Sequence, residues 1–134
     1  MGARPNPESE RPLHGPLQSF DLNAEVSRLR EEKARQESGR NAITLRKGEG
    51  LNVVLLVMKK GARLDEHSAP GPITLSVHEG RIRFSAADED VEAEAGTVLA
   101  CDAGVRHSVE ALGDAVCLLN VATGSGGSAS PDNS

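Results

Sequence analysis

The sequence predicts an all-β fold, a jelly roll of two packed sheets preceded by a single α-helix. About eight short strand-like segments with glycine-rich turns follow one another over roughly eighty residues, as in double-sheet jelly rolls. The chain has no Trp or Tyr and only two Phe, so Val, Leu, Ile and Ala must build its core. Such side chains suit strands packed face to face. At 134 residues the chain has room for one domain of this kind.

The first forty residues are predicted to hold a leader and one helix. Residues 1–19 are rich in Pro, Glu, Arg and Ser, the composition of a disordered segment. A helix is expected over residues 20–40, with Asp21 as its N-cap and Gly39 as its C-terminal stop. Three residues at spacings of four and three give it one apolar face: Leu22, Val26 and Leu29. Because this face is narrow, the helix is expected to lie against the barrel or against a second subunit.

Residues 41–123 have the alternation and the turns of a β-domain. The first two predicted strands, Ala42–Arg46 and Leu51–Lys59, are separated by a glycine-containing turn. The second of them, LNVVLLVMK, is almost continuously apolar and should be buried on both faces. Six further strands are predicted: Ile73–His78, Arg81–Phe84, Val91–Ala95, Thr97–Cys101, His107–Ala111 and Ala115–Ala122. Residues 124–134, rich in Gly and Ser, are expected to be a disordered tail.

Alternation also predicts which side chains face inward. The strand Ile73–His78 places its apolar residues on one face and His78 on the other, and a hairpin turn at Glu79-Gly80 is expected to lead into the next strand. Inward-facing residues are predicted to line a pocket: Ile73, Leu75, Val77, Ile82, Phe84 and Cys101. Arg81 and Arg83 are predicted to lie on a solvated face, and the alternative is that they pair with Glu92 or Glu94 across a hairpin.

Charge and aromatic content argue against a nucleic-acid partner. The net charge is −5, and after residue 40 eight Lys and Arg face thirteen Asp and Glu. Binding to phosphates requires clustered Lys and Arg, and stacking on bases requires aromatic side chains. We therefore expect no nucleic-acid partner.

No apolar run approaches the roughly twenty residues that a membrane span requires. The first residues also lack the apolar segment of a signal peptide. We expect a cytoplasmic protein with no membrane partner. Cys101 and Cys117 lie in apolar strand-like runs and are expected to be buried free thiols.

Two stretches each carry a glycine and then a histidine that enters a strand-forming run: GARLDEHSAPGPITLSVHEG, from Gly61, and GTVLACDAGVRHSVEA, from Gly96. Five residues separate Gly61 from His67, and two separate Gly104 from His107. These stretches resemble the two motifs of the cupin superfamily, small β-barrels that often hold a metal with histidines and a carboxylate. The resemblance covers roughly residues 42–123. It implies a jelly-roll barrel with one divalent transition metal, Fe, Mn, Ni or Zn, on His67 and His107.

Two of the four ligand positions of the family carry no ligand here. Ala69 stands at the second histidine position, and the glutamate position falls on Ile73 or Thr74. Two imidazoles hold a divalent ion weakly unless a third protein group joins them. Four residues offer a further donor atom: Asp65, Glu66, Cys101 and Asp102. The sequence leaves open whether a metal binds or whether both histidines are polar residues lining a metal-free pocket.

Three functions are compatible with these residues. The one we favour is the binding of a small apolar or weakly polar molecule, with His67 and His107 as its polar contacts. The second is a metal-dependent enzyme of oxygenase, isomerase or decarboxylase type that acts on a small organic acid. The third is a purely structural barrel that serves dimerisation. Because cupins commonly pair through sheet edges, we expect a homodimer. Whether the protein is an enzyme stays open, since cupin folds host many unrelated activities.

Overall fold

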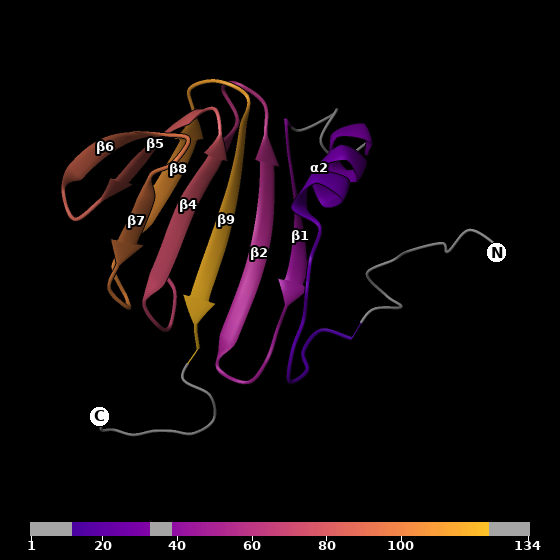
Figure 1. Ribbon diagram of the computed structural model, residues 1–134. Coiled ribbons are helices and arrows are strands. Elements are labelled where there is room, and N and C mark those ends of the chain that lie inside the picture. Colours follow the sequence, from indigo (N-terminus) through magenta and orange to yellow (C-terminus); the bar gives the residue numbers. More distant parts are fainter. Residues whose placement is uncertain (1–11, 33–38, 124–134) are drawn as a thin grey trace.

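The computed structural model describes residues 12–32 and 39–123, which form nine strands and one helix (Figure 1). In chain order the elements are α2 Leu22–Glu31, β1 Arg40–Arg46, β2 Leu51–Met58, β3 Arg63–His67, β4 Ile73–Glu79, β5 Arg81–Ala86, β6 Glu89–Glu94, β7 Val98–Cys101, β8 His107–Ala111 and β9 Ala115–Ala122. The predicted all-β fold with one N-terminal helix is confirmed. The predicted tail and most of the predicted leader lie outside the described residues.

The strands form two antiparallel sheets that pack face to face. One sheet has five strands in the order β1-β2-β9-β4-β7, and the other has four in the order β3-β8-β5-β6. In Figure 1 the strands β2, β9 and β4 lie at the front and the four-stranded sheet lies behind them. This is the double-sheet jelly roll that the strand count predicted.

The turn at Glu79-Gly80 does not make the expected hairpin. β4 belongs to the five-stranded sheet and β5 to the four-stranded sheet, so the chain crosses between the sheets at Gly80. Both strands alternate as predicted, but alternation within a strand does not reveal its partner.

β3 is a strand that the sequence did not predict. Its residues, RLDEH, include a single large apolar side chain, and only Leu64 packs against the core between the sheets. As an edge strand it is mostly exposed, and the alternation that marks the other strands is therefore missing.

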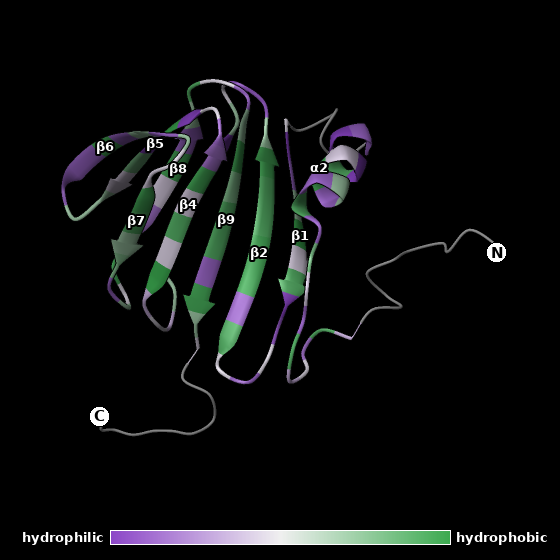
Figure 2. Ribbon diagram, in the orientation of Figure 1, coloured by the Kyte–Doolittle hydropathy of each residue, from purple (hydrophilic) through white to green (hydrophobic). Residues whose placement is uncertain are grey.

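The main core fills the space between the two sheets. Its buried members come from both sheets: Leu56, Met58, Ile73, Leu75, Val77, Ile82, Phe84, Ala93, Val109, Ala111, Ala115 and Cys117. Figure 2 shows β2 and β9 as mainly hydrophobic along their length. Nearly all of this core is aliphatic, as the composition predicted.

A second core lies between α2 and the outer face of the five-stranded sheet. Val26 and Leu29 of the helix pack against a buried group on β1, β2 and β9: Ile43, Leu45, Leu55, Val57 and Val116. The two cores meet at the second half of β2, whose last four residues are all buried. Burial of β2 on both faces is thus confirmed for that half.

The helix begins as predicted and ends earlier than predicted. The Asp21 side chain caps it by accepting a 3.1 Å hydrogen bond from the backbone N–H of Ala24. Its last residue is Glu31, and Glu32 already has an extended backbone. After Leu29 the next positions at helical spacing are polar, so further turns would have no apolar side chain to bury against the sheet. None of the helices in residues 12–32 and 39–123 is long and apolar enough to span a membrane.

Candidate functional site

The two motif histidines come together on neighbouring strands of the four-stranded sheet. His67 ends β3, His107 begins β8, and the two are direct partners across the sheet. Leu64 pairs with Val109, and the register shifts between Leu64 and His67. His107 and Val109 share one face of β8, so this β-bulge turns His67 to the same face as Leu64. Without the bulge, strict alternation would place His67 on the opposite face.

The ring nitrogens of the histidine pair are arranged in a specific way. The two Nε2 atoms lie 3.2 Å apart. Nδ1 of His67 lies 2.9 Å from the carbonyl oxygen of Asp65, and Nδ1 of His107 lies 3.1 Å from that of Val105. A carbonyl oxygen only accepts hydrogen bonds, so each Nδ1 carries the proton and donates it. In the neutral rings both Nε2 atoms therefore present lone pairs to one another, and a proton or a metal cation between them would relieve their repulsion.

His107 is the buried member of the pair. Its side chain is 4% exposed and is the only buried polar one in residues 12–32 and 39–123. The Phe84 ring stacks on it at a centroid distance of 5.6 Å and an interplanar angle of 13°. Burial lowers the pKa of His107, the nearby His67 lowers it further, and the hydrogen bond to the Val105 carbonyl partly offsets both. His107 is therefore held in the neutral form that ligates metals. His67 is exposed at the mouth of the barrel.

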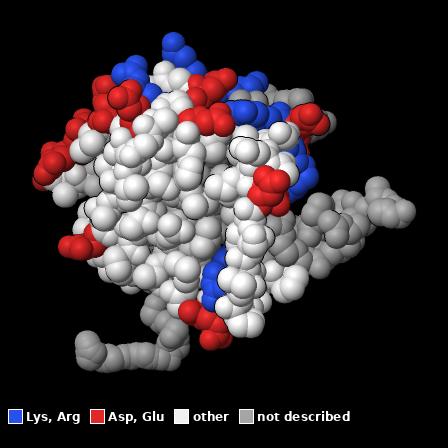
Figure 3. All heavy atoms as spheres, viewed as in Figure 1, with Lys and Arg blue, Asp and Glu red and all other residues white. Residues whose placement is uncertain are grey.

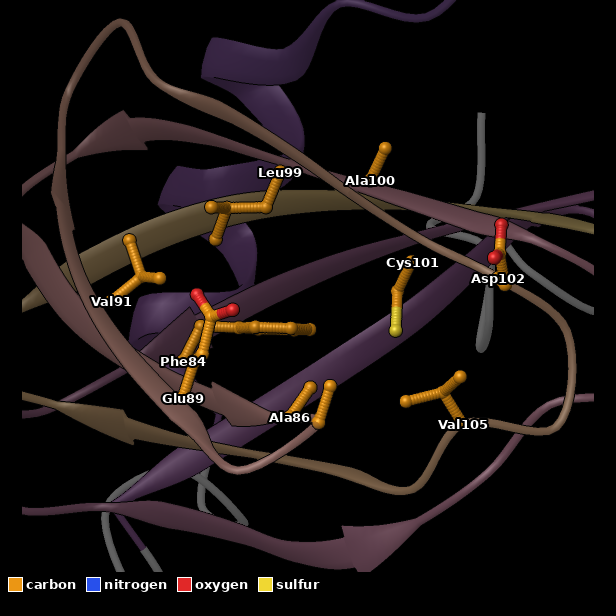
Figure 4. A pocket seen from close by; sticks show the side chains of 10 residues that line it. Phe84, Ala86, Glu89, Val91, Leu99, Ala100, Cys101, Asp102 and Val105 are labelled. Atoms are coloured by element: carbon orange, nitrogen blue, oxygen red, sulfur yellow. The ribbon is translucent and has the colours of Figure 1, made fainter.

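A pocket of about 310 Å³ is lined by residues that contact His107. Ten residues line it: Phe84, Ala86, Ala87, Glu89, Val91, Leu99, Ala100, Cys101, Asp102 and Val105 (Figure 4). Three of them adjoin His107, since Phe84 stacks on it, Val105 accepts its hydrogen bond, and Ala86 is its partner across β5 and β8. The lining is largely apolar and contains two carboxylates but no Lys or Arg.

The four further donors named from the sequence do not complete a metal site. No group of three or more His, Cys, Asp or Glu residues that could hold a metal occurs in the part of the chain that the structure describes. Asp65 and Glu66 lie in the bulge and are exposed, and Glu66 forms an ion pair of 3.2 Å with Arg106. Cys101 and Asp102 line the pocket instead. The described residues thus supply two nitrogen ligands.

The residues predicted to line a pocket divide into two groups. Phe84 and Cys101 line the pocket beside the histidines, and Figure 4 shows the Cys101 thiol pointing toward Ala86 and Val105. Ile73 and Cys101 also border a second hollow, of about 340 Å³. The other three are packed in the main core, where each is at most 2% exposed: Leu75, Val77 and Ile82.

Several residues of the pocket were missed from the sequence. Leu99 alternates with Cys101 on β7, so alternation could have found it. Glu89 and Val105 follow turns, where side chains do not alternate regularly between two faces. No pattern in the sequence therefore indicated that they line the pocket.

The two cysteines differ in burial. Both are free; Cys117 is buried as predicted, and burial raises its pKa to about 11. The prediction of a buried thiol is wrong for Cys101, which is half-buried because the edge strand β7 borders the pocket.

The outward-facing residues singled out in the sequence are placed largely as expected. His78 is exposed, with its Nε2 atom 3.2 Å from the Ser76 hydroxyl. Arg81 and Arg83 both pair with Glu92, at 3.1 and 3.4 Å.

Comparison with known proteins agrees with this architecture. A family model described as "Cupin domain" matches residues 54–122, which is more than half of the chain. The match begins within β2 and ends at the last residue of β9, so it includes both histidines. No curated protein matches the sequence.

Solved structures with the same fold come from several bacteria. An RmlC-like cupin protein from Desulfovibrio desulfuricans is 24% identical with a TM-score of 0.65, over 80% of this chain and 97% of that one. A conserved protein of unknown function from Streptococcus pyogenes is 22% identical with a TM-score of 0.65, over 82% and 90% of the two chains. A cupin superfamily protein from Desulfitobacterium hafniense is 16% identical with a TM-score of 0.60, over 62% and 76%. At these identities the likeness establishes the fold alone.

Proposed function

The chain belongs to the cupin domain family, and we propose that it binds a small, largely apolar molecule beside a divalent transition metal held by His67 and His107. This proposal combines the histidine pair with the pocket whose residues Phe84 and Val105 contact His107.

The observation that carries the proposal is the convergence of two Nε2 lone pairs at 3.2 Å. Two imidazole nitrogens on one tetrahedral ion, each at about 2.0–2.1 Å, would lie about 3.3 Å apart. The donor set therefore fits Zn²⁺ or a similar borderline ion. Because the described residues add no third ligand, the proposed affinity is modest, and solvent or the bound molecule would complete the coordination.

Neighbouring residues fix the tautomer and the orientation of the two imidazole rings. The carbonyls of Asp65 and Val105 fix the tautomer in which Nε2 is free, and such hydrogen bonds also raise the basicity of a ligand nitrogen. Phe84 fixes the plane of the His107 ring by stacking. A bound ion would supply Lewis acidity to an oxygen or nitrogen atom of the small molecule.

The pocket indicates the class of molecule. Its volume of about 310 Å³ suits a small ligand, and its walls offer the apolar side chains of Phe84, Leu99 and Val105. Its two carboxylates, Glu89 and Asp102, form no ion pair with any residue in 12–32 and 39–123. We therefore propose a neutral or cationic ligand, such as a small amine or alcohol. An enzyme acting on an organic acid has less support, since no Lys or Arg of the lining would hold the acid group.

Metal content is the direct test of the histidine pair. Tag-free protein would be dialysed to equilibrium against Fe²⁺, Mn²⁺, Ni²⁺ or Zn²⁺, and its metal content above that of the dialysis buffer would be measured by plasma mass spectrometry. We expect about one equivalent per chain, lost in the His67→Ala, His107→Ala double variant. The His78→Ala variant is the matched control, because that histidine is exposed on the outer face of β4 and should not matter. A folded wild-type protein that no ion loads or stabilises would refute the metal site.

The ligand class is tested separately by thermal shift on the metal-loaded protein. Pairs of probes with the same carbon skeleton, one an amine or alcohol and one a carboxylic acid, would be compared. We expect stabilisation by the amine or alcohol of a pair, and loss of that stabilisation in an Ala86→Phe variant that fills the pocket. Stabilisation by the acids alone would favour the enzyme alternative.

A further inference from the structure

We infer that Glu89 determines which molecules the pocket accepts, by binding the cationic end of a ligand whose other polar end faces His67 and His107. Such a role for Glu89 rests on the proposed function, and it adds both the residue that selects the ligand and the spacing of the ligand's two polar groups. Glu89 is the first residue of β6, and it lines the pocket (Figure 4).

Strand register places Glu89 in one row with the histidine pair. Across the four-stranded sheet His67 is the partner of His107, and His107 is the partner of Ala86. Ala86 is in turn the partner of Glu89 on β6. Direct partners in an antiparallel sheet carry their side chains on the same face. The row therefore has two imidazoles at one end and a carboxylate at the other.

The core residues of β6 show that this row faces the interior of the barrel. Ala93 is buried in the main core beside its partner Ile82. Side chains alternate along a strand, so Glu89, four positions before Ala93, shares its inward face. The next residue, Asp90, pairs with Ser85 and faces outward. Two acidic residues that are adjacent in the sequence thus lie on opposite faces of the sheet.

The small side chain of Ala86 leaves the middle of the row open, and Ala86 accordingly lines the pocket. Neighbouring strands lie about 4.8 Å apart, so two spacings of about 10 Å in total separate His107 from Glu89. A ligand that reaches from one end to the other needs polar groups about 5 Å apart, once a contact of about 2 to 3 Å at each end is subtracted. A three-carbon amino alcohol has this span.

The turn that precedes Glu89 has an unusual backbone. Ala87 has a φ of 52° and Asp88 a φ of 64°. A two-residue hairpin with positive φ at both positions normally contains Asn and Gly, since other side chains are strained there. Backbone strain of this kind gathers at functional sites. Here the tight turn keeps Glu89 directly opposite Ala86.

The charges around the pocket favour a cation. All of its lining residues come from residues 84–105, a stretch with six Asp and Glu and no Lys or Arg. In Figure 3 acidic side chains follow the left edge of the molecule, where Figure 1 places β6. In the part of the chain that the structure describes, no Lys or Arg pairs with Glu89. An ammonium group would give this carboxylate a charge-assisted hydrogen bond.

An inward-facing charge on an edge strand can also prevent pairing with other chains. β6 is such an edge, but Asp90, Glu92 and Glu94 already place charge along it. The two roles differ in what they predict, because only a ligand-binding Glu89 discriminates between small molecules.

The test uses pairs of probes that differ in charge. Amino alcohols of two to five carbons with terminal groups, and the 1-alkanols in which a methyl group replaces the ammonium, would be titrated into the full-length protein by calorimetry, with Zn²⁺ and in EDTA. We expect wild type to bind 3-amino-1-propanol about tenfold or more tightly than 1-butanol, in both buffers. Glu89→Gln should reduce this ratio to about threefold or less, while its metal content stays that of wild type.

Asp90→Asn is the matched control. It removes the same charge from the adjacent, outward-facing residue and should keep the wild-type ratio. Asp102→Asn, the other carboxylate of the pocket, should lower the ratio less than Glu89→Gln does.

A wild-type protein without preference for the ammonium, or a Glu89→Gln variant that keeps the preference, would overturn the inference. So would a preference that only Asp102→Asn abolishes. Wild-type protein that loads no metal would contradict the proposed metal site alone, because the ratio in EDTA still reports on Glu89.

Discussion

At the scale of single residues, the site depends on a histidine that is both buried and hydrogen-bonded. His107 stacks on Phe84, donates from Nδ1 to a carbonyl and faces a second imidazole. Each of these contacts restricts rotation of the imidazole ring, so the direction of its Nε2 atom is fixed. Substitution of Phe84 would release the ring without removing either ligand nitrogen.

The lowered pKa of His107 predicts how the stability of the metal-free protein depends on pH. The ordinary pKa of 6.5 applies to the unfolded chain, and the folded pKa lies below it because of burial. Between these two values the unfolded state binds more protons, so the free energy of unfolding falls as pH decreases below about 6.5. Above that pH the ring is neutral in both states and contributes no pH dependence.

Urea unfolding in EDTA at several pH values between 8 and 5 would measure this contribution. We expect the difference in unfolding free energy between wild type and His107→Asn to shrink as pH falls through this range. A difference that stays constant would show that His107 titrates alike in both states. The His78→Asn variant, exposed on β4, serves as the control.

The two cysteines predict a difference in thiol reactivity. Cys117 is 0% exposed and has a pKa of about 11, so its reactive thiolate form is scarce and inaccessible. Cys101 is half-buried and lines the pocket. With Ellman's reagent at pH 8 we expect one thiol per chain to react in the folded protein and the second only on unfolding. Cys101→Ser should abolish the first reaction, and two equal rates in wild type would contradict the structure.

At the scale of elements, the bulge in β3 decides whether the site exists. The register shift after Leu64 brings His67 to the inner face of an otherwise exposed edge strand. The side chains of the bulge residues Asp65 and Glu66 are exposed, so the bulge acts through the extra residue that it inserts and through the Asp65 carbonyl, which accepts the hydrogen bond of His67.

Deletion of Glu66 is therefore predicted to act differently from its substitution. Removing one residue restores regular alternation and turns His67 to the outer face, so metal loading should be lost while the rest of the fold is kept. Glu66→Ala removes only an exposed ion pair with Arg106, and it should load metal as wild type does. Metal content and circular dichroism of the two variants check this, and equal loading of both would refute the role of the bulge.

At the scale of the whole molecule, the two sheets are joined by crossings in which backbones approach closely. Gly80 lies at the crossing from β4 to β5 with a φ of 78°, and a Cβ atom there would overlap the carbonyl oxygen of Asp114. Gly96 also has a positive φ, of 96°, but a Cβ atom there would meet nothing.

These two glycines predict different costs for the same substitution. Gly96→Ala should destabilise by about 1 kcal/mol, the cost of a positive φ. Gly80→Ala adds an overlap with the backbone of Asp114 and Ala115, so we expect a loss of about 3 kcal/mol or more. Urea unfolding of both variants measures the difference, and equal losses would mean that the crossing tolerates a side chain.

The sequence by itself determined the fold class, most of the strands and the two histidines. Alternation and glycine turns are local signals, and they identified eight of the nine strands in the described residues. Alternation also identified the inward faces of β4 and β5, because the period of a strand fixes which side chains share its face, but Leu75, Val77 and Ile82 pack in the core and do not line the pocket as predicted. The family followed from the spacing of glycine and histidine in the two motifs, which is likewise a local property of the chain.

Only the tertiary structure decided how these elements combine. β3 has no alternation, and β4 and β5 alternate alike but belong to different sheets. The 3.2 Å approach of His67 and His107 arises from strand register. Register joins residues that are distant in the sequence, such as His67 and His107, and its energy comes from pairing and burial across the whole sheet. A local pattern cannot contain that information, because it depends on every strand at once.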